Sequence, residues 1–218
     1  MSIKQNLETL LQTIPANVKL VAVSKTQSSD AILQAYECGQ RIFGENRHKE
    51  LIEKVSTLPK DIIWHYIGAI QRSNVKYVVP RVSLIHSVDS DKLLEEINRE
   101  AAKCSKVMDV LFEVHVASEQ SKSGWSIDEL NEYMAKKVYR DYLYIRVRGL
   151  MAMATNTDDQ DKIRAEFNTI ANLYKTIKST YFKNISSFDT LSAGMSSDYQ
   201  IAIECGSNMV RLGSKVFK

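Results

Sequence analysis

A lysine follows the first apolar run of the chain. Residues 18–23 are rich in Val and Leu, as expected for a parallel strand buried on both faces, and Lys25 comes shortly after them. Active sites of α/β barrels lie at the carboxyl ends of the strands, and a neutral lysine amine condenses with aldehydes to form a Schiff base. For this lysine alone, the better explanation of its position is that the strand simply exits into solvent there. A role for Lys25 in Schiff-base chemistry must therefore be supported by other residues.

Two turns of small residues lie near the C-terminus, at 191–198 and 209–214. Barrels commonly bind phosphate with the loops after strands seven and eight and a helix N-terminus. Glycine lets backbone N–H groups approach an anion, serine hydroxyls donate hydrogen bonds, and the helix dipole adds positive potential. Either turn alone is explained by ordinary turn and N-cap chemistry, but two at these positions favour a phosphate site.

Arg211 lies within the last apolar run, which is unusual for a residue normally found at the surface. It could pair with a buried carboxylate such as Glu45. It could also donate to a bound ring, and an arginine beside a pyridine nitrogen leaves that nitrogen unprotonated.

Three histidines, His65, His86 and His115, fall on expected strands and raise the question of a metal site. Their spacing matches no H-x-H or H-E-x-x-H pattern. We therefore expect core or supporting histidines and no metal. The loop 121–124, Ser-Lys-Ser-Gly, could bind an anion, although a solvated loop explains it equally well.

These residues are positioned by eight expected strands that alternate with helices about every 25 residues, as in a (β/α)8 barrel. The expected strands are 18–23, 41–44, 62–67, 84–88, 107–116, one within 143–153, 188–191 and 209–213. The expected helices are 3–13, 31–38, 46–55, 91–104, 126–136, 158–178 and 198–205. No outer helix is expected after strand eight, and helix 3–13 is expected to fill its place. We predict an α/β, TIM-type barrel that forms one domain over residues 1–218.

The composition is that of an ordinary folded protein: 218 residues, 44% hydrophobic and 25% charged. The net charge of +3 has no basic block, which argues against a nucleic-acid partner. No signal-peptide core or membrane span is evident. Three widely separated cysteines are typical of buried thiols in a reducing cytosol, so we expect a cytoplasmic protein.

Taken together, the motifs resemble those of the pyridoxal phosphate homeostasis proteins, single-domain relatives of the alanine racemase N-terminal barrel. The motifs that carry the resemblance are 22–25 (AVSK), 43–46 (FGEN), 65–68 (HYIG) with Gln71, 119–124 (EQSKSG), 148–151 (RGLM), 192–198 (SAGMSSD) and 210–213 (VRLG). They run almost from end to end, so their order makes the resemblance specific.

The resemblance implies that Lys25 holds pyridoxal 5'-phosphate as an aldimine and that Arg211 faces the pyridine nitrogen. It implies that the phosphate is received by Ser196, Gly213 and Ser214. Further cofactor-binding residues implied in this way are Asn46, His65, Met153, Ser192, Gly194 and Met195.

Three features depart from the family pattern: Ala193 replaces a methionine, His115 stands where asparagine is common, and the loop 71–74 has an unusual form. Loss of the methionine is expected to loosen apolar packing beside the cofactor.

The expected function is buffering or delivery of the cofactor inside the cell, with little or no catalysis. Candidate recipients are the apo forms of pyridoxal phosphate enzymes. The alternatives are a slow amino-acid racemase and a barrel hydrolase or isomerase without this cofactor. Related racemases carry a second domain that supplies a tyrosine base and the main dimer contact, and none is expected here. A barrel tyrosine such as Tyr66 is a weak substitute, so we expect a monomer without fast racemization.

Overall fold

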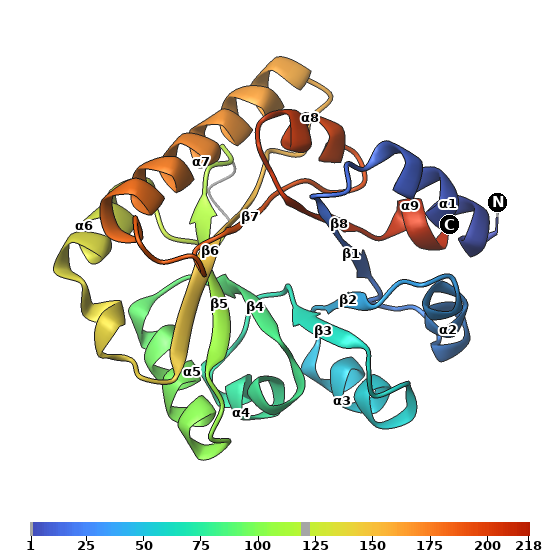
Figure 1. The fold of residues 1–218 in the computed structure, drawn as a ribbon, viewed down its shortest axis with the longest axis horizontal. Helices are drawn as coiled ribbons and strands as arrows, with labels where there is room; N and C mark the ends of the chain where they lie inside the picture. The colour runs from blue at the N-terminus through green and yellow to red at the C-terminus, as the bar shows by residue number, and fades with distance from the viewer. Residues whose placement is uncertain (1, 119–122) are drawn as a thin grey trace.

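The computed structural model describes residues 2–118 and 123–218, in which eight parallel strands form a closed barrel (Figure 1). The strands are β1 (Lys19–Val23), β2 (Ile42–Glu45), β3 (Ile63–Tyr66), β4 (Leu84–Val88), β5 (Met108–His115), β6 (Ile145–Met153), β7 (Thr190–Ser192) and β8 (Met209–Leu212). They follow one another in chain order, and β1 closes the barrel by pairing with β8. The predicted (β/α)8 barrel is confirmed.

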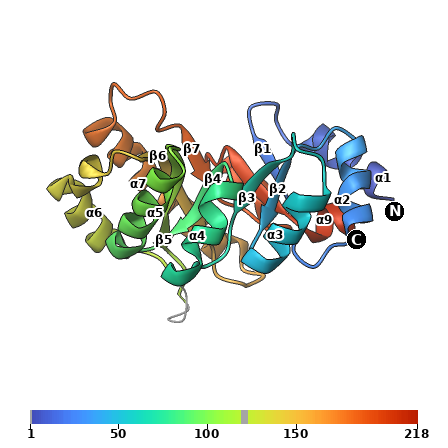
Figure 2. The ribbon, with the colours of Figure 1, turned by 90° about the horizontal axis from the view of Figure 1, so that it is seen from below.

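Helices surround the strands on the outside of the barrel (Figures 1 and 2). The α-helices are α1 (Ile3–Thr13), α2 (Ser29–Glu37), α3 (His48–Thr57), α4 (Val75–Val78), α5 (Asp91–Lys103), α6 (Ile127–Lys136), α7 (Gln160–Tyr181), α8 (Tyr199–Glu204) and α9 (Ser214–Phe217). Short 3-10 turns lie at Arg72–Asn74, Val79–Arg81 and Val138–Asp141. The expected bounds are close for most of these elements. Strand seven was expected at 188–191, but β7 begins two residues later, at Thr190.

The expectation that no helix follows strand eight is wrong, because α9 begins directly after Gly213. This short helix lies beside α1 (Figure 1). The side chain of Asn6 on α1 joins the two helices by donating to the carbonyl oxygens of Val216 and Lys218, at 3.1 and 2.8 Å. The position outside strands β8 and β1 is therefore shared by both ends of the chain. The α4 turn was also missed, because four helical residues give too little periodicity to detect.

The core has two parts, as the barrel geometry requires. The larger cluster packs the helices onto the outer face of the sheet. The smaller one fills part of the barrel interior with Val21, Leu84, Leu111, Met151 and Met209, drawn from five different strands. Burial of large aliphatic side chains inside the sheet supplies much of the hydrophobic stabilisation.

One glycine is required by the strand packing itself. Gly149 in β6 has φ +151°, and a Cβ atom there would lie 1.7 Å from the carbonyl oxygen of Thr190 in β7. The register between β5 and β6 also shifts beside it. A side chain at this position is incompatible with the β6–β7 pairing.

No helix in the part of the chain that the structure describes is long and apolar enough to cross a membrane.

Candidate cofactor-binding site

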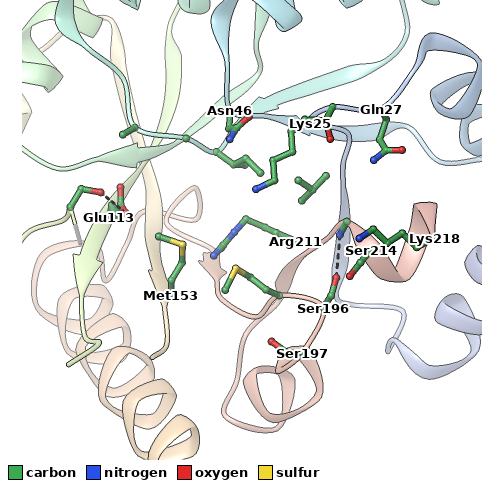
Figure 3. Close-up of a pocket in the computed structure, with 18 residues that line it drawn as sticks. Lys25, Gln27, Asn46, Glu113, Met153, Ser196, Ser197, Arg211, Ser214 and Lys218 are labelled. Carbon is green, nitrogen blue, oxygen red and sulfur yellow. Dashed lines mark hydrogen bonds between the residues drawn. The ribbon is translucent and has the colours of Figure 1, made fainter. Parts of the chain in front are cut away.

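A cavity of about 810 Å³ lies where the strands end at their carboxyl side (Figure 3). Parallel strands bring all their carboxyl ends to one rim of a barrel, which is why residues far apart in the chain meet there. The cavity is lined by Val23, Lys25, Thr26, Gln27, Asn46, Ile67, Gly68, Ala69, Glu113, Ser123, Met153, Met195, Ser196, Ser197, Arg211, Gly213, Ser214 and Lys218. Most of the predicted site residues are among them: Lys25, Asn46, Met153, Met195, Ser196, Arg211, Gly213 and Ser214.

Lys25 is two residues beyond the end of β1, and its side chain points into the cavity (Figure 3). Ser24 continues the parallel pairing, since its N–H donates to the Gly44 carbonyl oxygen at 3.0 Å. Thr26 then turns the chain with φ +63°. The amine therefore enters the cavity from a turn at the end of a buried strand, and Lys25 itself is exposed.

The two serine turns meet at the opposite side of the cavity. The backbone N–H of Gly213 donates to Ser196 Oγ at 3.3 Å, which joins the turn after β7 to the turn after β8. Ser214 opens α9 beside them, and its side chain lies next to Ser196 in Figure 3. Two hydroxyls and a backbone N–H group thus share one corner of the cavity, which is a donor set suited to an anion. We refer to Ser196, Gly213 and Ser214 as the serine cradle.

Arg211 is buried in β8 and lines the cavity floor. Its guanidinium donates to the Ser192 carbonyl oxygen at 2.9 Å, to Ser192 Oγ at 2.7 Å and to the Ala152 carbonyl oxygen at 3.1 Å. Burial lowers the pKa of Arg211 to about 10, although the charges of Glu113 and Asp198 oppose this shift. The guanidinium therefore keeps its positive charge at neutral pH.

The alternative partner for Arg211, the buried Glu45, is engaged elsewhere. Its Oε1 accepts hydrogen bonds from Ser24 Oγ at 2.6 Å and from Lys54 Nζ at 2.7 Å. The explanation of Arg211 as the partner of this carboxylate is therefore wrong.

Three predicted residues do not line the cavity but support it from behind. Ser192 holds Arg211, and the Gly194 carbonyl oxygen accepts the Arg211 backbone N–H at 3.0 Å. Gly194 has φ +98°, and a Cβ atom there would lie 2.8 Å from the Cα of Tyr199, so the turn needs glycine. The third of these residues is His65, which lies inside the barrel.

His65 takes part in a buried polar chain across the barrel. Its Nδ1 lies 3.0 Å from His86 Nε2, and His86 Nδ1 lies 3.1 Å from Ser192 Oγ, which also accepts from Arg211. Burial, with a contribution from the charge of Lys19, lowers the pKa of His65 to about 3. Burial likewise holds the pKa of His86 well below its ordinary value, helped by His65 and Arg211. Both rings are therefore neutral at pH 7.

The described residues contain no group of three or more His, Cys, Asp or Glu side chains that could hold a metal ion. His115 Nδ1 is buried without a hydrogen-bond partner.

Sequence reasoning missed two charged groups that line the cavity, Lys218 and, on β5, Glu113. Glu113 is buried and accepts a hydrogen bond from Ser123 Oγ at 3.1 Å. Burial raises the pKa of Glu113, as does the charge of Asp89, while Ser123 and Arg211 act in the opposite direction. The available signal for Glu113 was its position inside the long apolar run 107–116, where Asp109 is the other carboxylate.

The remaining sequence observations have clear positions. Ala193 is buried in the main core, and its N–H donates to the Met209 carbonyl oxygen at 3.1 Å, so it lies behind the cavity wall. The loop 71–74 forms a 3-10 turn. Of the 121–124 loop, residues 121 and 122 lie outside the described residues, while Ser123 lines the cavity.

The family model for the alanine racemase N-terminal domain matches residues 1–218, so the chain belongs to this family of barrels. Among its relatives is the pyridoxal phosphate homeostasis protein of Vibrio alginolyticus, which is 36% identical over 231 residues that cover 99% of this chain and 97% of the relative. Within this family, the chain belongs to the pyridoxal phosphate homeostasis proteins.

Solved structures agree with this assignment. PipY of Synechococcus elongatus without pyridoxal phosphate superimposes with a TM-score of 0.93 at 30% identity, over 99% of this chain and 100% of PipY. PipY with pyridoxal phosphate bound superimposes with a TM-score of 0.89 over the same shares of the two chains.

Proposed function

We propose that this protein binds pyridoxal 5'-phosphate through Lys25 and acts in the homeostasis of that cofactor, by buffering or delivering it, with little or no catalysis. The names of the relatives and the PipY structure with bound pyridoxal phosphate support this proposal. The observation that carries it is the convergence of an amine, a serine cradle and a buried arginine on one cavity.

The residues of the cavity fit this cofactor chemically. The amine of Lys25 suits the aldehyde, the serine cradle suits the phosphate dianion, and the guanidinium of Arg211 suits a pyridine nitrogen that carries no proton. Asn46 adds an unsatisfied polar group to the wall, because its Oδ1 is buried without a hydrogen-bond partner. A ligand group that donates a hydrogen bond to this oxygen would satisfy it.

The fixed charge of Arg211 argues for binding over catalysis. When bound, pyridoxal phosphate supplies an electron sink for carbanion chemistry, and the sink is strong only when its ring nitrogen is protonated. Three hydrogen bonds hold the guanidinium to Ser192 and Ala152, so the cation keeps its place beneath the cavity. A fixed positive charge there disfavours a proton on the ring nitrogen.

The racemase alternative needs a second acid or base opposite Lys25. Tyr66, the barrel tyrosine considered for that role, is buried and donates to the Asn46 carbonyl oxygen at 3.0 Å. Burial and the charge of Glu45 raise its pKa, which makes it a poorer acid at neutral pH. The position of Tyr66 in the barrel therefore does not favour racemization.

We further propose that residues 1–218 form one binding unit that acts as a cytoplasmic monomer and that apo forms of pyridoxal phosphate enzymes receive the cofactor. Light scattering of the purified protein tests the oligomeric state. Activation of an apo-enzyme by the loaded protein tests delivery, and a free-cofactor scavenger distinguishes direct transfer from release into solution.

The principal test combines a spectrum, a mass and a rate. Purified protein mixed with pyridoxal phosphate should show an absorption band that free cofactor lacks, and borohydride should add the mass of one pyridoxyl phosphate group to the Lys25 peptide. Racemization of L- or D-alanine should be slow; turnover of roughly 1 per second or more, as in ordinary enzymes, would favour the racemase. Absence of the band and the adduct would contradict the proposed function.

A further inference from the structure

The two peptide groups that flank Lys25 are both held by one turn of helix α3. Lys54 Nζ donates to the Ser24 carbonyl oxygen at 2.8 Å, and the Thr26 backbone N–H donates to Glu50 Oε2 at 2.8 Å. Glu50 and Lys54 are four residues apart on the helix and form an ion pair at 3.2 Å. The backbone before and after Lys25 is therefore tied to the same pair of side chains, which we call the α3 clamp.

The charge of the clamp is balanced inside the protein. Lys54 is a buried lysine, with 8% of its side chain exposed, and it pairs at 2.7 Å with Glu45, whose side chain is fully buried. Burying two charges costs desolvation energy, and well-packed apolar residues often serve stability equally well. Stability alone is therefore a poor explanation for this ion pair. Its geometry provides another, because Lys54 also reaches the backbone next to Lys25.

The turn that the clamp holds is strained. Thr26 has φ +63°, a left-handed conformation that is uncommon for any residue other than glycine and unfavourable for a β-branched one. Such a conformation persists only when the surrounding structure enforces it. Glu50 enforces it here by accepting the Thr26 N–H. Without that bond, the turn can relax and redirect the side chain of Lys25.

We propose that Glu50 and Lys54, balanced by Glu45, are positioning residues that aim the Lys25 amine into the cavity. None of the three lines the cavity, so they act through the backbone of the turn and not by contact with a ligand. The effect of this positioning on capture of the cofactor rests on the proposed function. The structural claim, the enforced turn at Thr26, holds without any ligand.

The first test uses the protein without cofactor. Hydrogen exchange at the Thr26 amide, measured by NMR relative to the amides of β1, should be faster by on the order of tenfold in Glu50→Ala and in Lys54→Met. Glu50→Gln keeps an acceptor oxygen and should restore most of the protection. The matched controls are Glu53→Ala and Lys49→Met, exposed positions on the same helix, which should exchange like the unmodified protein.

The second test measures capture of pyridoxal phosphate. The rate at which borohydride traps the cofactor on Lys25 should fall by about fivefold in the clamp variants, because the amine is less often in place to react. Cofactor retained noncovalently in equilibrium dialysis should change by less than about twofold, because the serine cradle supplies that binding.

The outcomes separate the two proposals. If the unmodified protein binds no pyridoxal phosphate, the proposed function fails, while the exchange test still decides the clamp. Unchanged exchange at Thr26 and unchanged trapping in both Glu50→Ala and Lys54→Met would overturn the clamp. Parallel losses of trapping, retention and β1 protection would also overturn it, because they indicate general destabilisation. Should Lys54→Met fail to fold, the Glu50 variants decide, since that side chain is partly exposed.

Discussion

The neutral histidine pair inside the barrel makes stability depend on pH below 7. His65 has a pKa of about 3 in the folded chain, against an ordinary value of 6.5, and His86 is shifted in the same direction. In the unfolded chain both rings take up a proton as the pH falls below about 6.5. The unfolded state then binds more protons, so the free energy of unfolding must decrease as the pH falls.

The size of the effect follows from the shift. A group that stays neutral when folded and has an ordinary pKa when unfolded loses about 2 kcal/mol between pH 7 and pH 5. Two buried rings give at most about 4 kcal/mol, a large part of a typical stability. The loss is complete for His65 only near pH 3, its folded pKa. The raised pKa of Glu113 acts in the opposite direction, so a difference between variants is the better measure.

Urea unfolding at pH 7 and pH 5, followed by circular dichroism, measures this difference. His65→Gln keeps a polar side chain in the barrel but does not titrate, so its loss of stability on acidification should be smaller than that of the unmodified protein by about 2 kcal/mol. His48→Gln, on the outer helix α3, is the matched control and should leave the loss unchanged. An equal pH dependence in all three proteins, or an NMR titration of His65 with a midpoint near 6.5, would refute the reasoning.

Three further variants test the site and the fold. Lys25→Ala should abolish the borohydride-trapped pyridoxyl adduct, as seen by mass spectrometry, yet retain cofactor noncovalently; an adduct that persists on another lysine contradicts the assignment. Ser196→Ala combined with Ser214→Ala should weaken pyridoxal phosphate binding by roughly 3 kcal/mol or more in equilibrium dialysis, since each charge-assisted hydrogen bond contributes roughly 1.5–3 kcal/mol. Pyridoxal without its phosphate should bind far more weakly than the phosphate ester, and equal affinities would show that the phosphate site is misplaced. Gly149→Ala should lower the free energy of unfolding by at least about 3 kcal/mol, because the new Cβ collides with the Thr190 backbone; thermal unfolding close to that of the unmodified protein would contradict the packing.

Most of the barrel was predictable because its signal is local. Parallel strands buried on both faces are continuous apolar runs, and the helices between them repeat apolar residues at helical spacing. The order of these elements predicts a barrel, and the barrel in turn predicts that Lys25 and the serine turns meet at one rim. The short elements α4 and α9 carry too few residues for such a signal, and they were missed.

The sequence by itself determined the kind of fold, the amine at the end of β1 and the two serine turns, because each depends on residues adjacent in the chain. The tertiary structure alone decided which buried polar groups are partners. Ser192 and His86 are 106 residues apart, and closure of the barrel brings them within 3.1 Å. The same closure pairs Arg211 with Ser192, while Glu45 pairs with Lys54. The spacing of these residues along the chain does not predict the pairing, because it depends on which side chains face one another in the folded protein.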